Sequence, residues 1–450
     1  MINYKGYQNK KILVVGLAKS GVAASLLLHR LGAFVTVNDW KPLSENKDAQ
    51  QLLDQGIKVI CGSHPVELLD EGFEMIVKNP GIPYTNPLIK GAIAKGLPVI
   101  TEVELAYQIS EADIIGITGT NGKTTTTTLV HEMISKDQKK SYVAGNIGTV
   151  ASEVAQIAHP GEAMVVELSS FQLMGIRQFA PAISIITNIY DAHLDYHASK
   201  QEYVEAKAAI TKNQTENHYL IVNADQEELM DAVQHTRAKK VLFSTKRLMT
   251  EGISTDGEQI FMNGESVVRL KDIVLPGRHN LENIMAAIGA AKLYGVSNES
   301  IRAVLGEFAG VKHRTQFVRE WNQIKFYNDS KATNILATQS ALDAFKGPTV
   351  LLCGGLDRGN SFDELSASMS NVKAAVVFGE TADKMAEAAK AGGVENIISV
   401  KDVKDAVHAA AESAESGDVV LLSPACASWD QYPTFEVRGD IFIDEVNKLK

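Results

Sequence analysis

Short apolar runs alternate with helical patterns along most of the chain, and this alternation restricts the fold more than any other feature of the sequence. The runs are KILVV, FVTVN, IKVI, EMIV, IIGIT, AMVVEL, ISIIT, YLIVN, TVLLC, AAVVF and DVVLLS. Strands that alternate with helices in this way form parallel sheets, which helices cover on both faces. We therefore predict an α/β fold with mainly parallel sheets.

Two breaks in the pattern indicate three domains. A chain of 450 residues is too long for one ordinary core, and 45% hydrophobic residues can fill two or three. One break follows GLPVITEVEL near residue 101, and the other lies in FAGVKHRT near residue 310. The helical segment LENIMAAIGAAKLYG precedes the second break and predicts an amphipathic helix whose apolar face carries Leu281, Ile284, Met285 and Ile288. The predicted domains are 1–101, 102–310 and 311–450.

The composition excludes several classes of protein. The net charge is −10 and no basic block occurs, so the electrostatic pattern of a nucleic-acid-binding protein is missing. No apolar run is long enough to cross a bilayer, and MINYKGYQNKK leads into ILVV without a signal-type segment. Three distant cysteines, Cys61, Cys353 and Cys426, argue against a disulfide framework or a zinc site. We expect a soluble cytoplasmic monomer with no nucleic-acid or membrane partner.

The segment ITGTNGKTTTTTL, residues 117–129, predicts a phosphate-binding loop. It follows an apolar strand, contains Gly119, Gly122, Lys123 and Thr124, and leads into a helix, although the usual first glycine is replaced by Ile117. Lys123 is expected to reach the β- and γ-phosphates of a nucleotide, and Thr124 to bind magnesium. The structural alternative is a Gly-Asn turn followed by an ordinary helix.

A second glycine turn lies near the N-terminus, in VVGLAKSGVAASLLLHRLG. Gly16 and Gly21 stand between a strand and a helix, and Asp39 ends the next strand, as in dinucleotide-binding folds, although Ala18 occupies the middle glycine position. NAD binding, binding of another nucleotide and tight helix-sheet packing all remain open. The turn at Asn79 and Gly81 is either a ligand contact at a strand end or a structural turn.

Polar residues also follow the strands beyond the glycine loop. Glu167 and Asn188 each come at or just after a strand end, where a carboxylate can bind magnesium near a γ-phosphate. DAHLDYH then adds Asp191, His193 and Asp195, and His193 is either a ligand to a second cation or a structural histidine. By its local sequence alone, Lys207 in QEYVEAKAAI is an ordinary surface lysine.

With these segments identified, the chain resembles the Mur ligases, the ATP-dependent ligases that build the peptide stem of peptidoglycan. The motifs GTNGKT, GNIG, ELSSFQL, HLD, GRHNLEN, HRT and NDSKATN occur in the order of the family, over nearly all 450 residues. Within the family, NDSKATN and LSPACASWDQ are most similar to the member that adds D-glutamate to UDP-N-acetylmuramoyl-L-alanine. The resemblance implies a Rossmann-like N-terminal domain for the UDP-sugar, a central P-loop domain for ATP and a Rossmann-like C-terminal domain for the amino acid.

The resemblance also implies roles for individual residues. The catalytic set is Lys123, Glu167, His193 and Lys207, and the last of these is implied to be carbamylated. The implied ligands of two magnesium ions are Thr124, Glu167, His193 and Lys207. The implied ATP contacts are Gly119, Thr120, Asn121, Gly122, Lys123, Thr124, Thr125, Asn280, Asn283, Arg314, Asp329 and Lys331. The implied substrate contacts are Gly16, Ser20, Asp39, Asn79, Gly81, Asn146, Ser169, Thr333, Arg358, Ser428 and Phe435.

Amide synthesis explains why such a site needs ATP. A carboxylate is a poor electrophile, so the γ-phosphate is first transferred to the alanyl carboxylate, and the amine of D-glutamate then attacks the acyl phosphate. Both steps gather negative charge, which requires magnesium and fixed cations. The alternatives are a ligase of the same family for another amino acid, a P-loop kinase or NTPase, a nicotinamide dehydrogenase and a pure binding protein. The three-domain layout further predicts that the C-terminal domain closes when ATP and substrate are bound.

Overall fold

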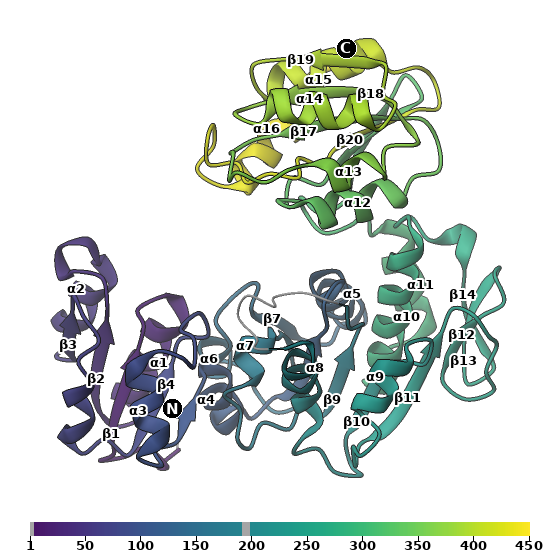
Figure 1. The fold of residues 1–450 in the computed structure, drawn as a ribbon. Coiled ribbons are helices and arrows are strands. Elements are labelled where there is room, and N and C mark those ends of the chain that lie inside the picture. Colours follow the sequence, from purple (N-terminus) through teal and green to yellow (C-terminus); the bar gives the residue numbers. More distant parts are fainter. Residues whose placement is uncertain (1–3, 191–198) are drawn as a thin grey trace. The chain divides into compact units, whose positions relative to one another are not determined.

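The computed structural model describes residues 4–190 and 199–450 of the chain. They form two compact units, Met1–Ile273 with Leu281–Gly306, and Val274–Asn280 with Glu307–Lys450. The first unit contains two sheets and the second contains one, and all three are α/β structures with mainly parallel strands, as predicted (Figure 1). The domain boundaries near residues 101 and 310 stay predictions.

The N-terminal sheet is entirely parallel and has the order β3-β2-β1-β4-β5 within the described residues. Its strands are β1 Lys11–Val15, β2 Phe34–Asp39, β3 Lys58–Cys61, β4 Met75–Lys78 and β5 Val99–Ile100, and its helices are α1 Lys19–Arg30, α2 Lys47–Asp54 and α3 Pro87–Ala94. The chain runs outward from β1 in one direction and then returns to β4 on the other side. The strand order therefore reverses between β1 and β4, and open α/β sheets bind ligands at such a reversal.

The central sheet has the order β14-β13-β12-β11-β10-β9-β6-β8-β7. Its strands are β6 Asp113–Thr118, β7 Ser141–Gly145, β8 Ala163–Glu167, β9 Ile183–Ile186, β10 Tyr219–Asn223, β11 Lys239–Ser244, β12 Ile253–Thr255, β13 Gln259–Met262 and β14 Glu265–Arg269. The associated helices are α4 Glu102–Ile109, α5 Lys123–Lys136, α6 Ala151–Val154, α7 Ser170–Leu173, α8 Lys200–Ala208, α9 Glu227–Ala232, α10 Arg278–Leu293 and α11 Asn298–Glu307. The strands β12 to β14 are an antiparallel extension that the sequence pattern missed.

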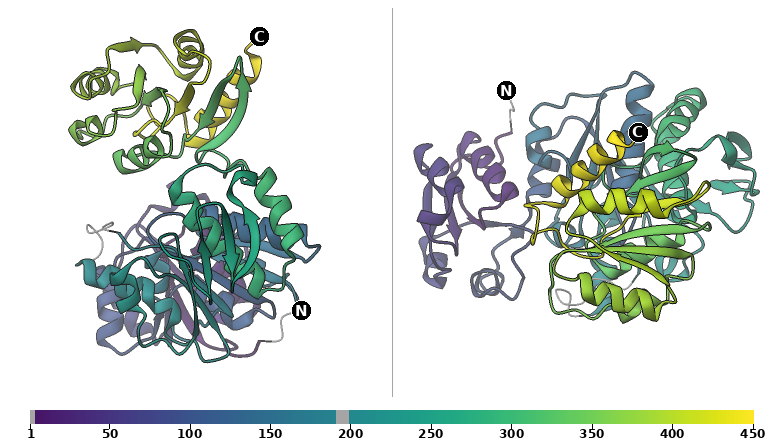
Figure 2. Two further views of the ribbon diagram at one scale, coloured as in Figure 1. Left: turned by 90° about the vertical axis from the view of Figure 1, so that its right-hand side faces the viewer. Right: turned by 90° about the horizontal axis from the view of Figure 1, so that it is seen from above.

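The sheet of the second unit has the order β15-β16-β20-β17-β18-β19. Its strands are β15 Gln316–Trp321, β16 Ile324–Asn328, β17 Thr349–Gly354, β18 Val372–Phe378, β19 Asn396–Ser399 and β20 Val419–Leu422. Its helices are α12 Ile335–Asp343, α13 Asp363–Ser366, α14 Ala382–Ala391, α15 Val403–Ser413 and α16 Phe435–Lys448. The last helix packs against the antiparallel pair β15 and β16, as Figure 2 shows.

All the apolar runs identified in the sequence form strands, but the prediction of an amphipathic helix at 281–295 was wrong in part. The helix is there as α10, yet residues 283–291 are buried on every side, Ala286 and Ala290 as fully as Ile288. Small residues allow this, because a Cβ on Gly289 would lie 2.9 Å from Ile253 Cδ1. The helix is therefore inside the fold rather than on its surface.

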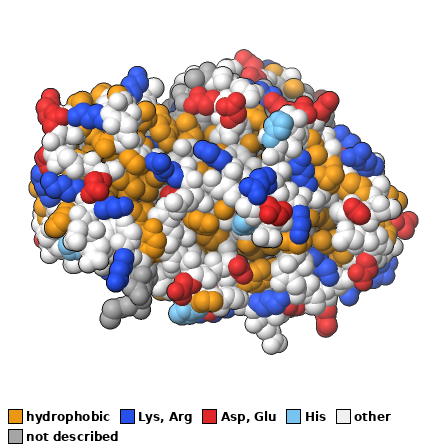
Figure 3. Space-filling view, turned by 90° about the horizontal axis from the view of Figure 1, so that it is seen from below, with side chains coloured by type: hydrophobic (Ala, Val, Ile, Leu, Met, Phe, Trp, Pro, Cys, Tyr) orange, Lys and Arg blue, Asp and Glu red, His pale blue; other side chains and the backbone are white. Residues whose placement is uncertain are grey.

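One continuous apolar core joins the two sheets of the first unit. Helices α1, α4 and α6 lie side by side between them (Figure 1). On the face drawn in Figure 3, acidic and basic side chains are interspersed among apolar ones. No helix in the described ranges combines the length and the apolar character needed to span a bilayer.

Glu104 of α4 provides a polar contact within this core. Its side chain is fully buried, and its carboxylate accepts hydrogen bonds from the backbone N–H groups of Arg177 (2.8 Å), Gln178 (2.9 Å) and Phe179 (3.1 Å). One carboxylate satisfies three successive backbone donors at once, so the interaction holds the segment before β9 against α4.

We predict that Glu104→Gln lowers the free energy of unfolding by about 1–3 kcal/mol, because its amide group places a donor where the backbone already supplies donors. Urea denaturation followed by circular dichroism measures the change. The control is Glu111→Gln, an exposed carboxylate on the surface. Equal unfolding midpoints for the two variants would contradict this role of Glu104.

Candidate functional site

The glycine loop, Gly119–Thr124, connects β6 to α5 and requires its glycines. Gly119 has φ +143° and Gly122 has φ +79°, a region of backbone conformation that side chains other than glycine rarely adopt. A Cβ on Gly119 would overlap Thr187 Oγ1, and a Cβ on Gly122 would overlap Asn283 Oδ1. The loop is therefore packed closely against the end of β9 and the start of α10, unlike an exposed Gly-Asn turn.

The residues after β9 hold the loop through its backbone. Thr187 Oγ1 donates to Asn121 O (2.7 Å), and Asn188 Oδ1 accepts from Asn121 N (2.8 Å). Asn188 O also accepts from Thr120 N (2.9 Å). These hydrogen bonds attach the loop to the segment that follows β9. The N-terminus of α5, with its partial positive charge, therefore lies at a turn whose conformation is already fixed.

Lys123 lies at the first position of α5 and folds back over the loop. Its Nζ donates to Gly119 O (2.9 Å) and Thr120 O (2.8 Å). Thr124 and Thr125 follow in the first helical turn and are buried. A cation and a helix N-terminus are thus combined at one turn, which is the arrangement that binds phosphate.

Lys207 of α8 is buried at the same loop, so its interpretation as a surface lysine was wrong. Its side chain is 2% exposed, its Nζ donates to Gly119 O (2.7 Å), and it lies 4.6 Å from the ring centre of Tyr203. Burial lowers the pKa of Lys207 well below its ordinary value, and the charge of Lys123 lowers it further, while Glu167 acts in the opposite direction. The Tyr203 hydroxyl lies 3.0 Å from Thr120 Oγ1.

Glu167 ends β8 beside the loop. Its Oε1 accepts from Asn146 Nδ2 (2.8 Å), whereas its buried Oε2 has no hydrogen-bond partner in the described part of the chain. A buried carboxylate oxygen is rarely left without a donor or a cation. Oxygen ligands of this kind suit magnesium, so Glu167 fits the expected metal site.

The remaining predicted metal ligand is not among the described residues. His193 lies outside the described residues, as do Asp191 and Asp195. Among residues 4–190 and 199–450, no group of three or more His, Cys, Asp and Glu side chains has the arrangement of a metal site. The described cysteines are free thiols.

The N-terminal candidates meet where the strand order reverses. Gly16 follows β1 and Asn79 follows β4, and Asn79 Nδ2 donates to Ser20 Oγ (2.9 Å) across the gap. Asn79 Oδ1 accepts from Gly81 N (3.1 Å). A Cβ on Gly16 would lie 2.7 Å from Ile82 Cδ1 and would overcrowd the turn. The geometry supports a ligand site at this point.

Asp39 and Ser169 have structural contacts as well. Asp39 Oδ2 accepts from Leu17 N (2.7 Å) and its Oδ1 from Lys41 N (2.9 Å), so the carboxylate shapes the turn after β1. Ser169 caps α7 together with Gln172 in a reciprocal capping box. A substrate contact by either side chain stays a prediction.

Candidates of the second unit gather at the carboxyl ends of β16, β17 and β20. Lys331 Nζ lies 5.5 Å from the ring centre of Phe435, and Thr333 N donates to Lys331 O (2.9 Å). The guanidinium of Arg358 lies 5.0 Å from the ring centre of Trp429, next to buried Ser428. Cations and aromatic rings are thus concentrated at one edge of the sheet.

Arg438 of α16 connects these loops, and the sequence analysis missed it. Its side chain is fully buried and donates to Ser330 Oγ (3.0 Å), Ser330 O (2.9 Å) and Cys426 O (3.1 Å). Burial lowers the pKa of Arg438 to about 10. No local signal distinguishes it from the surface arginines of an amphipathic helix, since its partners are far away in the sequence.

Three predicted ATP contacts are also buried or nearly so. Asp329 accepts from Thr315 N (3.0 Å) and Ser423 Oγ (2.9 Å), and burial raises its pKa to about 7. Asn280 Nδ2 donates to Pro276 O (2.6 Å). Arg314 is half-buried in the turn before β15. Because the two units are described separately, contacts of these residues with the glycine loop stay predictions.

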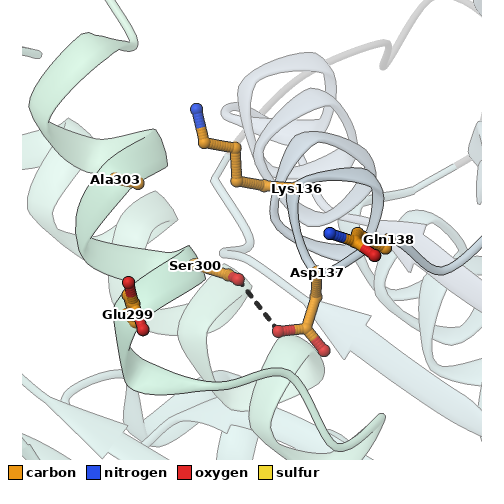
Figure 4. Close-up of a pocket in the computed structure, with 6 residues that line it drawn as sticks. All are labelled: Lys136, Asp137, Gln138, Glu299, Ser300 and Ala303. Atoms are coloured by element: carbon orange, nitrogen blue, oxygen red, sulfur yellow. Dashed lines mark hydrogen bonds between the residues drawn. The ribbon is translucent and has the colours of Figure 1, made fainter.

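A surface hollow of about 330 Å³ lies away from these residues, between the end of α5 and α11 (Figure 4). Asp137 Oδ1 accepts from Ser300 Oγ (2.9 Å) and from Ser297 Oγ (2.8 Å) there. Lys136 ends α5, roughly 20 Å along the helix axis from Lys123 at 1.5 Å per residue. The hydrogen bonds of Asp137 therefore hold the C-terminal end of α5 to the segment around α11, and the hollow is not part of the candidate site.

Three family models match consecutive parts of the chain. They describe a Mur ligase MurD-like N-terminal domain at residues 10–101, a Mur ligase middle domain at residues 117–291 and a Mur ligase glutamate ligase domain at residues 313–426. Together with the glycine loop geometry, these matches decide the family. The chain belongs to the Mur ligase family. Such ligases use ATP.

Curated relatives resemble this Mur ligase over its whole length. The UDP-N-acetylmuramoylalanine–D-glutamate ligase of Geobacillus kaustophilus (strain HTA426) is 60% identical over 445 residues, which is 99% of each chain. The enzyme of that name from Listeria monocytogenes serotype 4b (strain F2365) is 59% identical over 444 residues, 98% of this chain and 97% of its own.

Solved structures support the fold at lower sequence identity. The UDP-N-acetylmuramate-alanine ligase MurC of Thermotoga maritima aligns with a TM-score of 0.60 at 20% identity, covering 98% of this Mur ligase and 100% of its own chain. The MurF ligase of Thermotoga maritima in complex with ADP has a TM-score of 0.58 at 17% identity, covering 100% and 97%. These likenesses confirm the predicted α/β fold.

We predict that Gly119→Ala weakens ATP binding by at least about tenfold, because the new methyl group overlaps Thr187 Oγ1 and overpacking of this kind costs about 1–3 kcal/mol. Isothermal titration calorimetry measures the affinity. The control is Gly161→Ala, where φ is also positive but nothing lies within 4 Å of the added Cβ. Equal ATP affinities for the two folded variants would contradict the close packing of the loop.

Proposed function

We propose that this Mur ligase joins D-glutamate to UDP-N-acetylmuramoyl-L-alanine with ATP as the phosphoryl donor, a cytoplasmic step in peptidoglycan precursor synthesis. The observation that carries the proposal is the convergence of Lys123, Lys207 and Glu167 on one glycine loop. The names of relatives that are 59–60% identical over nearly the whole chain support the choice of substrates. A monomer is the assembly we expect.

In the first step, an oxygen of the alanyl carboxylate attacks the γ-phosphorus, the bond to the β-phosphate oxygen breaks and ADP leaves. Lys123 and the N-terminus of α5 balance the charge that accumulates on the phosphates during this transfer. Asn283, which packs on Gly122, and Asn280, Arg314, Asp329 and Lys331 are the proposed further ATP contacts. The product of this step is an acyl phosphate.

In the second step, the neutral amine of D-glutamate attacks the acyl carbon, the carbon-oxygen bond to phosphate breaks and inorganic phosphate leaves. The amine loses a proton as the amide forms. Arg358 and Lys331 are cations suited to the two carboxylates of D-glutamate, and Arg358 can offer two parallel hydrogen bonds. Ser428, Thr333 and Phe435 complete the proposed amino-acid pocket.

Magnesium, when bound, would neutralise phosphate charge during both steps. Glu167 and Thr124 are suited to hold one ion, because Glu167 has a buried oxygen without a donor and Thr124 lies in the first turn of α5. His193 and carbamylated Lys207 are the proposed residues for the second ion.

Carbamylation of Lys207 requires a neutral amine, whose nitrogen forms a bond to the carbon of CO₂ and then releases a proton. A lowered pKa increases the neutral fraction of Lys207 at neutral pH. The carbamate is an anion, so it would replace a costly buried cation beside Lys123.

Product analysis tests the reaction. Incubation with UDP-N-acetylmuramoyl-L-alanine, ATP and D-glutamate is expected to yield one amide and one ADP per turnover, measured by mass spectrometry and a coupled ADP assay. Preference for another amino acid would indicate a different ligase of the family. ADP release without an amide product would indicate an NTPase and refute the proposal.

We predict that Lys123→Ala lowers kcat by at least about 100-fold, because one preorganised cation at a phosphoryl-transfer site contributes that much. UDP binding, which does not involve the glycine loop in this proposal, should stay unchanged and serves as the folding control. Amide formation at the parental rate by the folded variant would exclude the proposed role of Lys123.

We predict that the protein incubated with ¹³C-bicarbonate shows a carbamate carbonyl signal in its NMR spectrum, and that Lys207→Gln lacks this signal. The exposed Lys212, which follows on the same segment, supplies the control variant Lys212→Gln. A spectrum that is the same for both variants would contradict carbamylation at Lys207.

A further inference from the structure

Lys78, the last residue of β4, is a buried cation that the proposed function does not use. Its side chain is fully buried, and its Nζ donates to the carbonyl oxygens of Asn79 (3.3 Å), Pro80 (3.2 Å) and Ile82 (2.8 Å). The ammonium also lies 4.7 Å from the ring centre of Tyr84. Within the described residues it forms no ion pair with a carboxylate.

A buried ammonium without an anionic partner is costly, and most proteins avoid it. Here three carbonyl dipoles from one loop replace water, so all three donors of the ammonium are used. The loop in turn encloses the ammonium group with its carbonyl oxygens, as protein loops enclose a bound metal cation. Burial lowers the pKa of Lys78 to about 8, which leaves the group mainly protonated at pH 7.

The loop that Lys78 organises is part of the ligand site at the strand-order reversal. Asn79 bonds Ser20 of the opposite loop and Gly81 of its own loop, and Ile82 packs on the position of a Gly16 Cβ. A fixed positive charge close to this loop also favours the binding of an anion there. A sugar nucleotide carries such an anion in its diphosphate.

We propose that Lys78 is a positioning residue for the sugar nucleotide, holding residues 79–82 in the conformation that binds the diphosphate and adding positive potential there. This inference rests on the proposed function, which assigns the N-terminal domain to UDP. In this inference Lys78 contributes to the binding of a nucleoside diphosphate and takes no part in phosphoryl transfer.

The test compares variants of the full chain with uridine diphosphate as the probe. Lys78→Met keeps most of the volume but removes the charge and the donors. We expect its Kd for uridine diphosphate and its KM for the sugar nucleotide to rise about tenfold or more, since hydrogen bonds to charged groups are the strong ones. At saturating sugar nucleotide, kcat and the KM for ATP should stay within about twofold of the parental values.

Three further variants separate charge from structure. Lys90→Met on α3 removes an exposed lysine of the same domain and should bind uridine diphosphate as the parent does. Lys78→Arg keeps a cation with several donors, whereas Lys78→Gln keeps donors without charge, so Arg should bind uridine diphosphate more tightly than Gln. This pair decides the matter if Lys78→Met does not fold.

The outcomes distinguish the inference from the proposed function. Unchanged uridine diphosphate binding by folded Lys78→Met, or equal binding by the Arg and Gln variants, would refute the role of Lys78 alone. A parental protein that binds no uridine diphosphate would refute both. A fall in kcat without any change in KM or Kd would show that Lys78 acts elsewhere and would also overturn the inference.

Discussion

The close contact between the glycine loop and the end of β9 is the constraint on which the rest of the site depends. Thr187 and Asn188 bind the backbone of residues 120 and 121, and they approach so closely that glycine is required at 119. This contact directs the N-terminus of α5, and with it Lys123, toward one point. Lys207 and Glu167 then place their side chains at the same point from α8 and β8.

Buried basic side chains recur at the carboxyl edges of all three sheets. Lys78, Lys207 and Arg438 each donate to backbone carbonyl oxygens of a loop rather than to a carboxylate. A cation bound in this way, as at Lys78 and Arg438, fixes loop shape and leaves positive charge at the edge where anions bind. The nucleoside diphosphate and the dicarboxylic amino acid of the proposed function both need such charge.

The overall negative charge of the protein makes these local groups necessary. With a net charge of −10, the chain as a whole does not attract anionic substrates. Desolvation strengthens the field of a buried cation such as Lys78, and burial lowers the pKa of both Lys78 and Lys207. Burial makes these side chains costly for stability, and it also makes them effective at the sites.

Sequence patterns alone determined the α/β class, eleven of the twenty strands in the described residues and the glycine loop. Apolar periodicity and residue spacing are local, so they can be read along the chain, and the order of the Mur motifs added the family. The strands β5, β7, β11 to β16 and β19 were missed, because their pairing depends on neighbours rather than on their own residues.

The tertiary structure alone decided which charged side chains are buried. Lys207 has the local sequence of a surface residue, Lys78 ends an ordinary strand, and Arg438 lies in a helix with an ordinary amphipathic pattern. All three side chains are nevertheless buried. Their partners come from segments brought together only by packing, such as Gly119 for Lys207 and Ser330 for Arg438. Burial is a property of the whole fold, and for that reason no stretch of sequence encodes it by itself.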